Sequence, residues 1–135
     1  KYFLEIDGLK PVETVPAVWN HGTVPCDKAS GLLCEAPLLF DENNSTGRGV
    51  WGKAGEGCIV IAYRGDECFE TITRNAQLSQ AVGVVLINND REVNQLGRHE
   101  KKVPPPGIPT VCAPKGFGEL LSSARGTTRA RITRK

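Results

Sequence analysis

"CIVIAYRGDECFETITRNAQLSQAVGVVLI", Cys58 to Ile87, decides the predicted fold. Its two ends, "CIVIAY" and "GVVLI", are uninterrupted apolar runs rich in β-branched residues, which is typical of strands buried on both faces. Between them, Phe69, Ile72 and Ala76 recur near a 3.6-residue period and predict a helix. Asp66 stands where the N-cap of this helix is expected. Strand, helix and strand in so short a stretch predict a βαβ unit with a right-handed crossover.

The flanking segments complete a mixed α/β fold. Lys1 to Val24 reads as extended pieces, and Pro37 within "LLCEAPLLF" favours an edge strand or irregular structure there. Asp41 to Gly57 reads as a long polar loop. After the βαβ unit, three further elements are expected, namely a strand, a helix and a half-exposed strand: Ile108 to Ala113, Lys115 to Arg125, and Thr127 to Thr133.

Length and charge bound the function. A chain of 135 residues has the size of one domain, so 1–135 is expected to be a single domain. A formal net charge of +2 does not support a nucleic-acid footprint. No apolar run is long enough to span a bilayer, so no direct membrane insertion by this segment is expected. The chain starts at Lys1 and contains no Met, which suggests a segment of a larger secreted or membrane-anchored protein.

Five cysteines in a small domain suggest an oxidising compartment. Asn43 and Asn44 head two overlapping N-glycosylation sequons, Asn-Asn-Ser and Asn-Ser-Thr, in a polar loop. Together these features predict a secreted, extracellular or luminal protein of the secretory or endosomal pathway. No cysteine belongs to a CxxC pair and the two histidines lie far from ligand-like spacing, so no metal or other cofactor is expected.

Three motifs, in order, resemble those of the protease-associated (PA) domain family. "CIVIAYRGDECF" is similar to the family's strand followed by an Arg-Gly-x-Cys-x-Phe turn, although Cys68 falls one place late. "RNAQLSQAVGVVLINND" is similar to its helix and strand signature, and "GIPTVCAPKGFGELL" to its Ile-Pro strand and Gly-containing helix. The resemblance covers roughly Cys58 to Leu121. It implies a distorted β-barrel or sandwich with a central β-α-β-β-α core and flanking short helices.

The resemblance also implies a disulfide and a function. The family often ties the cysteine of the turn to one before the first core strand, which implies a Cys34–Cys68 bond. Family members act as non-catalytic modules in subtilisin-like and metallo-peptidases, vacuolar sorting receptors, intramembrane-protease relatives and transmembrane RING ubiquitin ligases. There they bind protein or peptide ligands or gate access to a catalytic unit.

The residues themselves also argue against catalysis by this domain. The Gly-x-Ser-x-Gly elbow is absent, and His21 and His99 lie in loop-like sequence. Cys58 and Cys112 sit in apolar strands, where a thiol behaves as a small hydrophobe and its pKa rises. "GRGVWG", Gly47 to Gly52, matches a dinucleotide-binding pattern literally but precedes a strand instead of following one.

Arg64-Gly65-Asp66 spells the adhesion tripeptide. It falls at the predicted turn from strand to helix, where Gly65 lets the chain reverse and Asp66 caps the helix. Local structure therefore explains the tripeptide, while adhesion stays open as an alternative.

The predicted ligand-binding surface is the long segment from Asn88 to Gly107, because loops of this length are commonly functional or disordered. Its candidate contact residues are Arg91, Glu92, Asn94, Gln95, Arg98, His99, Lys101 and Lys102. A solvated variable loop is the competing interpretation. We therefore expect a binding domain with no catalysis of its own, inside a parent that could be a receptor, a ubiquitin ligase or a protease. The strongest rival is a regulatory insert that controls substrate access in a subtilisin-like or metallo-peptidase.

Overall fold

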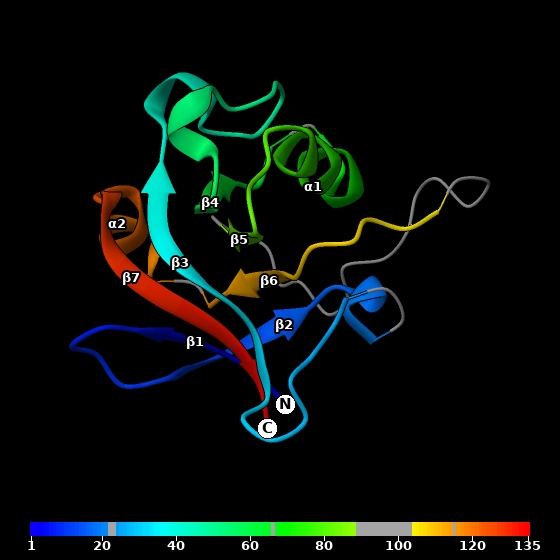
Figure 1. The fold of residues 1–135 in the computed structure, drawn as a ribbon. Coiled ribbons are helices and arrows are strands. Elements are labelled where there is room, and N and C mark those ends of the chain that lie inside the picture. The colour runs from blue at the N-terminus through cyan, green and yellow to red at the C-terminus, as the bar shows by residue number, and fades with distance from the viewer. Residues whose placement is uncertain (22–23, 66, 89–103, 115) are drawn as a thin grey trace.

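Seven strands within the described residues close into a barrel, with two short α-helices packed against it (Figure 1). The computed structural model describes residues 1–21, 24–65, 67–88, 104–114 and 116–135. Around the barrel the strands follow the order β1-β2-β6-β5-β4-β3-β7. The strands are β1 Tyr2–Ile6, β2 Val12–Pro16, β3 Leu32–Phe40, β4 Ile59–Tyr63, β5 Gly83–Ile87, β6 Thr110–Ala113 and β7 Arg125–Arg134. The helices are α1 Phe69–Leu78 and α2 Gly118–Ser122, with 3-10 turns η1 Val18–His21, η2 Glu42–Asn44 and η3 Lys53–Gly55. The α/β prediction is confirmed, and the barrel is closed.

The predicted strand, helix and strand are present as β4, α1 and β5. β4 and β5 pair in parallel, with Ile59 opposite Gly83, and β6 continues the parallel sheet on the other side of β5. Alternate residues of β5 point into two different cores: Val85 faces the barrel interior, whereas Leu86 faces the layer under α1. Successive side chains of these strands alternate between the two cores, so both faces of the sheet are buried. This explains why the strands read as unbroken apolar runs.

Pro37 lies inside the barrel wall, which corrects the expectation of an edge strand or irregular structure. β3 pairs with β4 on one side and with β7 on the other. Pro37 keeps Arg129 of β7 as its ladder partner, and the register shifts next to it, where β7 runs from Arg129 to Arg125 while β3 runs only from Pro37 to Leu39. A bulge therefore substitutes for an edge position.

The start of α1 also differs from the prediction. Its N-cap is Cys68, with extended φ and ψ of −73° and 154°, so Asp66 does not occupy that position. Asp66 itself lies outside the described residues. No side chain caps the first turn of α1 among the contacts that the structure describes. The helix begins two residues later than the capping preference of Asp suggested.

The Cys34–Cys68 disulfide is not formed. All five cysteines lie in the described part of the chain and are free thiols. The sulfur of Cys34 packs beside Gly83, where a Cβ would approach it to 2.9 Å, and Gly83 lies opposite the first residue of β4. Cys68 follows the carboxyl end of β4. Cys34 thus packs at the end of the sheet where β4 begins, whereas Cys68 comes after the end of β4, and a disulfide needs Cα atoms within about 7 Å.

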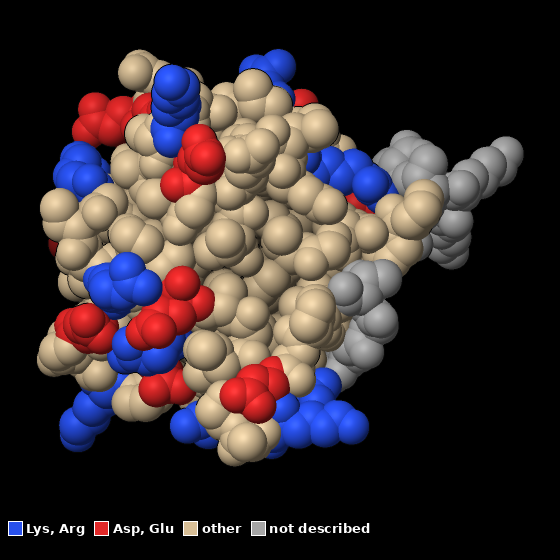
Figure 2. Space-filling view, viewed as in Figure 1, with Lys and Arg blue, Asp and Glu red and all other residues tan. Residues whose placement is uncertain are grey.

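The two ends of the chain meet on the barrel. The Lys1 ammonium donates to the Lys135 carbonyl at 2.8 Å, and the Lys135 N–H donates to the Lys1 carbonyl at 2.8 Å. Tyr2 and Arg134 are partners in the antiparallel β1–β7 pair, and Figure 1 shows N and C side by side. On the face seen in Figure 2, basic and acidic side chains are interspersed rather than gathered by sign, and the middle carries little charge.

Candidate functional site

An open groove of about 510 Å³ runs between α1 and the segment that leads into β6. The described residues that line it are three from the last two turns of α1 and two prolines: Arg74, Gln77, Leu78, Pro104 and Pro105. Residues three or four positions apart share one face of a helix. Ile72 and Ala76 face the core and are fully buried, so positions 74, 77 and 78 are left on the outer side.

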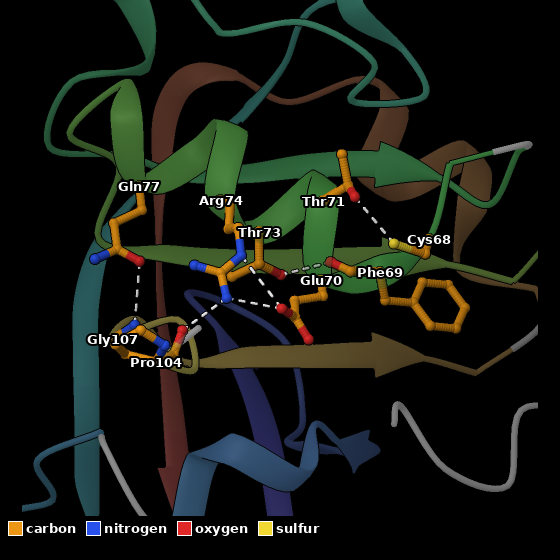
Figure 3. Close-up of polar contacts among 9 residues, drawn as sticks. All are labelled: Cys68, Phe69, Glu70, Thr71, Thr73, Arg74, Gln77, Pro104 and Gly107. Atoms are coloured by element: carbon orange, nitrogen blue, oxygen red, sulfur yellow. Dashed lines mark hydrogen bonds and ion pairs between the residues drawn. The ribbon is translucent and has the colours of Figure 1, made fainter. Parts of the chain in front are cut away.

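Two polar side chains of α1 hold the opposite wall of the groove. Nη2 of Arg74 donates to the Pro104 carbonyl at 2.6 Å, and Oε1 of Gln77 accepts the Gly107 N–H at 3.1 Å (Figure 3). Prolines have no N–H and favour an extended, stiff backbone, so their carbonyls are the groups that a helix side chain can capture. These contacts fix residues 104–107 alongside the helix.

Arg74 is itself oriented by a buried carboxylate. Oε2 of Glu70, a residue 1% exposed, accepts from Nη2 of Arg74 at 2.7 Å and from Nε at 3.2 Å. Thr73, on the same helix, donates to the Phe69 carbonyl at 2.9 Å and meets Thr110 of β6 at 3.2 Å. The first half of α1 thereby anchors to β6 while Arg74 reaches across to the prolines.

The groove opens onto exposed apolar surface. Leu78 is 74% exposed and Val50 is 60% exposed. Their neighbours in sequence are hydrogen-bonded to each other: the N–H of Trp51, which follows Val50, donates to Oγ of Ser79, which follows Leu78, at 2.7 Å. A leucine at the outer rim beside two prolines gives the groove a surface that an apolar side chain can cover. Nε2 of Gln77 has no partner among the described residues and can donate to a ligand.

The contact residues predicted from the sequence belong to a segment other than the described groove residues. Arg91, Glu92, Asn94, Gln95, Arg98, His99, Lys101 and Lys102 all lie outside the described residues. Their segment ends where the described wall of the groove begins, at Pro104. Sequence reasoning missed Arg74, Gln77 and Leu78. The available signal was Leu78, an apolar residue that breaks the inward period set by Ile72 and Ala76.

The described part of the RGD tripeptide is tied to the turn. The Arg64 N–H donates to the Ile87 carbonyl at 2.9 Å, and its guanidinium carbon lies 5.5 Å from the centre of the Phe69 ring. The Nη1 atom of Arg64 is buried. Gly65 is exposed. A receptor would have to compete with these contacts for the arginine, which supports the role of a turn.

The buried thiols are poorly suited to nucleophilic chemistry. Burial raises the pKa of Cys34 from 9.0 to about 12. Burial also raises the pKa of Cys112 from 9.0 to about 11, although the nearby Arg64 charge and a hydrogen bond from the backbone of Asn88 lower it. Burial also raises the pKa of Cys58. Cys58 and Cys112 are 8% and 3% exposed, which confirms that they pack as small hydrophobes.

Within the described ranges, no three His, Cys, Asp or Glu side chains converge as a metal site would require. His99 and the side chain of His21 lie outside those ranges. No described helix has the length and hydrophobicity that a bilayer crossing needs.

Comparisons with solved structures identify the fold. A zinc aminopeptidase from Bacillus subtilis matches with a TM-score of 0.69 and 21% identity over 98% of this chain and 29% of its own. An aminopeptidase from Aneurinibacillus sp. gives 0.69 and 21%, over 98% and 30%. A peptidase precursor from Shewanella amazonensis gives 0.59 and 12%, over 98% and 34%. The chain thus spans about a third of these proteins or less, and the likeness concerns the fold alone.

The comparison with curated proteins gives no match. The model of the PA domain family matches residues 22–121, which is most of the chain and includes β3 to β6, α1 and most of α2. With the three sequence motifs and a barrel shared with the aminopeptidase structures, this chain belongs to the PA domain family.

Proposed function

We propose that this domain is a non-catalytic protein- or peptide-binding module of a larger luminal or extracellular protein, and that its ligand binds in the groove between α1 and Pro104–Pro105. The observation that carries the proposal is Leu78, a large apolar side chain left 74% exposed at the rim of an open groove. The groove volume of about 510 Å³ falls within the usual range of ligand sites, about 300–1,000 Å³.

The lining indicates the chemistry of the ligand. Leu78 and the proline rings offer apolar contact, while Gln77 and Arg74 present N–H donors, and none of the described lining residues carries a carboxylate. The matching ligand is an extended peptide with one apolar side chain and backbone carbonyls or a carboxylate facing α1. Nε and Nη2 of Arg74 already donate to Glu70 and Pro104, so the donors left for such a ligand among the described residues are Nη1 of Arg74 and Nε2 of Gln77.

A peptide-display selection against the domain tests this proposal. Peptides enriched on the wild type are measured against Leu78→Asp and Gln77→Ala by fluorescence anisotropy. We expect Leu78→Asp to weaken binding at least tenfold, because it places a charge against an apolar side chain. The matched control is Leu9→Asp, at a 48% exposed leucine in the β1–β2 turn, which should bind as the wild type does. Equal loss in both variants, or no loss at Leu78, would reject the groove.

A regulatory insert in a peptidase is the second candidate. Lys1 and Lys135 are hydrogen-bonded neighbours, so a host chain could enter and leave the domain at one place. The fold relatives are aminopeptidase chains of which this domain covers about a third or less. The test replaces residues 1–135 by a short Gly-Ser linker in the full-length protein and compares cleavage of long and short peptides. A changed ratio supports the insert, whereas a parent without peptidase activity excludes it.

A further inference from the structure

We propose that, of the two overlapping sequons, Asn43 carries an N-linked glycan in the folded domain, and that Asn44 must stay unmodified because its amide closes the adjacent loop. The two asparagines are neighbours in sequence, yet the structure gives their side chains different tasks. This assignment rests on the luminal or extracellular location in the proposed function, and not on the proposed ligand groove.

The Asn43 side chain is available to solvent. Asn43 is exposed in η2, and its backbone N–H is held by Oδ1 of Asp41 at 2.9 Å. Among the described residues its carboxamide makes no hydrogen bond. The backbone is therefore fixed while Nδ2 projects into solvent, and a bulky substituent displaces no contact.

Both polar atoms of the Asn44 carboxamide are hydrogen-bonded to the backbone. Its Nδ2 donates to the Gly49 carbonyl at 2.8 Å, and its Oδ1 accepts the Gly49 N–H at 3.1 Å. The pair closes the loop from 44 to 49. That loop also docks on α1, since Nδ2 of Asn75 donates to the Gly47 carbonyl at 2.8 Å and a Cβ on Gly47 would collide with Ile72.

The stereochemistry of the linkage makes the two uses of Asn44 incompatible. Because Nδ2 and Oδ1 of Asn44 both bond to the backbone of Gly49, the two hydrogen bonds form a ring. The Nδ2 proton in this ring is the one on the same side of the amide as Oδ1. A planar secondary amide strongly prefers the trans form, which places the new substituent on that same side. The sugar carbon would occupy the position of the proton now donated to Gly49. An Asn44 glycan therefore breaks the loop closure, whereas an Asn43 glycan leaves it intact.

The modification itself needs a lipid-linked oligosaccharide as co-reactant. Nδ2 of Asn43 forms a bond to C1 of the first sugar, the C1–O bond to the lipid diphosphate breaks, and the lipid diphosphate leaves with the bonding electrons. One Nδ2 proton is released to a base. The acceptor pattern requires Ser45 two residues after Asn43, and Thr46 two residues after Asn44.

Two single substitutions separate the sequons. Thr46→Ala removes the Asn44 sequon alone, and Ser45→Ala removes the Asn43 sequon alone. The chain is secreted from a cell line that adds N-glycans, and glycan occupancy is mapped by peptide mass spectrometry after enzymatic deglycosylation in heavy-oxygen water. We expect the secreted wild type and Thr46→Ala to carry one glycan, on Asn43. Secreted Ser45→Ala should lose at least 90% of that occupancy without gaining it on Asn44.

Thermal unfolding of unglycosylated protein supplies the second measurement. Asn44→Gln should lower Tm by about 3–6 °C, because two loop-closing hydrogen bonds are lost. Asn43→Gln should leave Tm unchanged. Secreted wild type with its glycan on Asn44, or with no glycan on Asn43, overturns the proposal. So does an Asn44→Gln variant as stable as Asn43→Gln.

Discussion

Glu70 and Arg74 form an ion pair that is buried at one end and partly open at the other: 2.7 Å separates Oε2 from Nη2, with the two side chains 1% and 32% exposed. The same Nη2 donates to Pro104, so one arginine links a buried carboxylate of α1 to the wall of the groove. The wall of the proposed ligand site thus depends on the pair.

Arg74→Ala should destabilise the domain by about 2 kcal/mol, because it removes a positive charge from beside a buried carboxylate and leaves the Pro104 carbonyl without that donor. Urea unfolding measures the loss. Hydrogen exchange should also accelerate at the Gly107 amide, which borders the released wall. Arg48→Ala is the control, since the Arg48 side chain is 72% exposed and its one polar contact among the described residues is a 3.9 Å pair with Glu67, so stability should change by less than about 0.5 kcal/mol. Equal effects of the two substitutions would contradict this role for Arg74.

Gln80 offers a stabilising substitution. It follows the end of α1 with a φ of 62°, a left-handed conformation that costs an L-residue about 1–2 kcal/mol. Gln80→Gly should therefore raise stability by up to about 1 kcal/mol, after the greater freedom of glycine in the unfolded chain is allowed for. The matched control is Gly57→Ala, which places a side chain at a φ of 71° and should destabilise. The two substitutions should shift Tm in opposite directions. A loss of stability in Gln80→Gly would contradict the strained left-handed conformation of Gln80.

The sequence predicts those parts of the fold that are determined by residues close together in the chain. β4, α1 and β5 follow from the apolar runs and the helical period, because the burial of both strand faces and of one helix face is written in the residues of each element itself. Closure of the barrel is not local: it depends on β3 pairing with β7 around Pro37, more than ninety positions apart in sequence. A proline predicts a missing donor, and only the register shows that it is accommodated inside the sheet, with a bulge beside it.

The groove was beyond prediction for a related reason. Its donors come from α1, and their partners are backbone groups of residues 104–107, which a sequence pattern cannot place. The expected disulfide was wrong in this structure because it was transferred from the family. Here Cys34 packs beside Gly83, at the opposite end of β4 from Cys68.

The Cys112 thiol should make the domain sensitive to alkaline pH. Its pKa is about 11 when folded and 9.0 ordinarily, so between those values the unfolded chain loses a proton that the folded chain retains. Stability is therefore unaffected below about pH 9 and falls as pH rises toward 11, by up to about 1.4 kcal/mol per pH unit for this thiol. Urea unfolding of wild type and Cys112→Ala across this window measures the slope. The variant should show a shallower decline, and parallel curves would mean that the thiol does not contribute.

The meeting of Lys1 and Lys135 predicts that the chain can be circularly permuted. A few glycines can join Lys135 to Lys1, because the two residues are already linked by two hydrogen bonds of 2.8 Å. So short a linker has a small entropic cost of loop closure. New ends between Leu9 and Lys10 fall in an exposed turn between β1 and β2, where a break removes no strand pairing. This permutant should fold with a Tm within a few degrees of the original. A permutant opened between Val85 and Leu86, in the buried strand β5, should not fold. Failure of the Leu9 permutant as well would contradict the prediction.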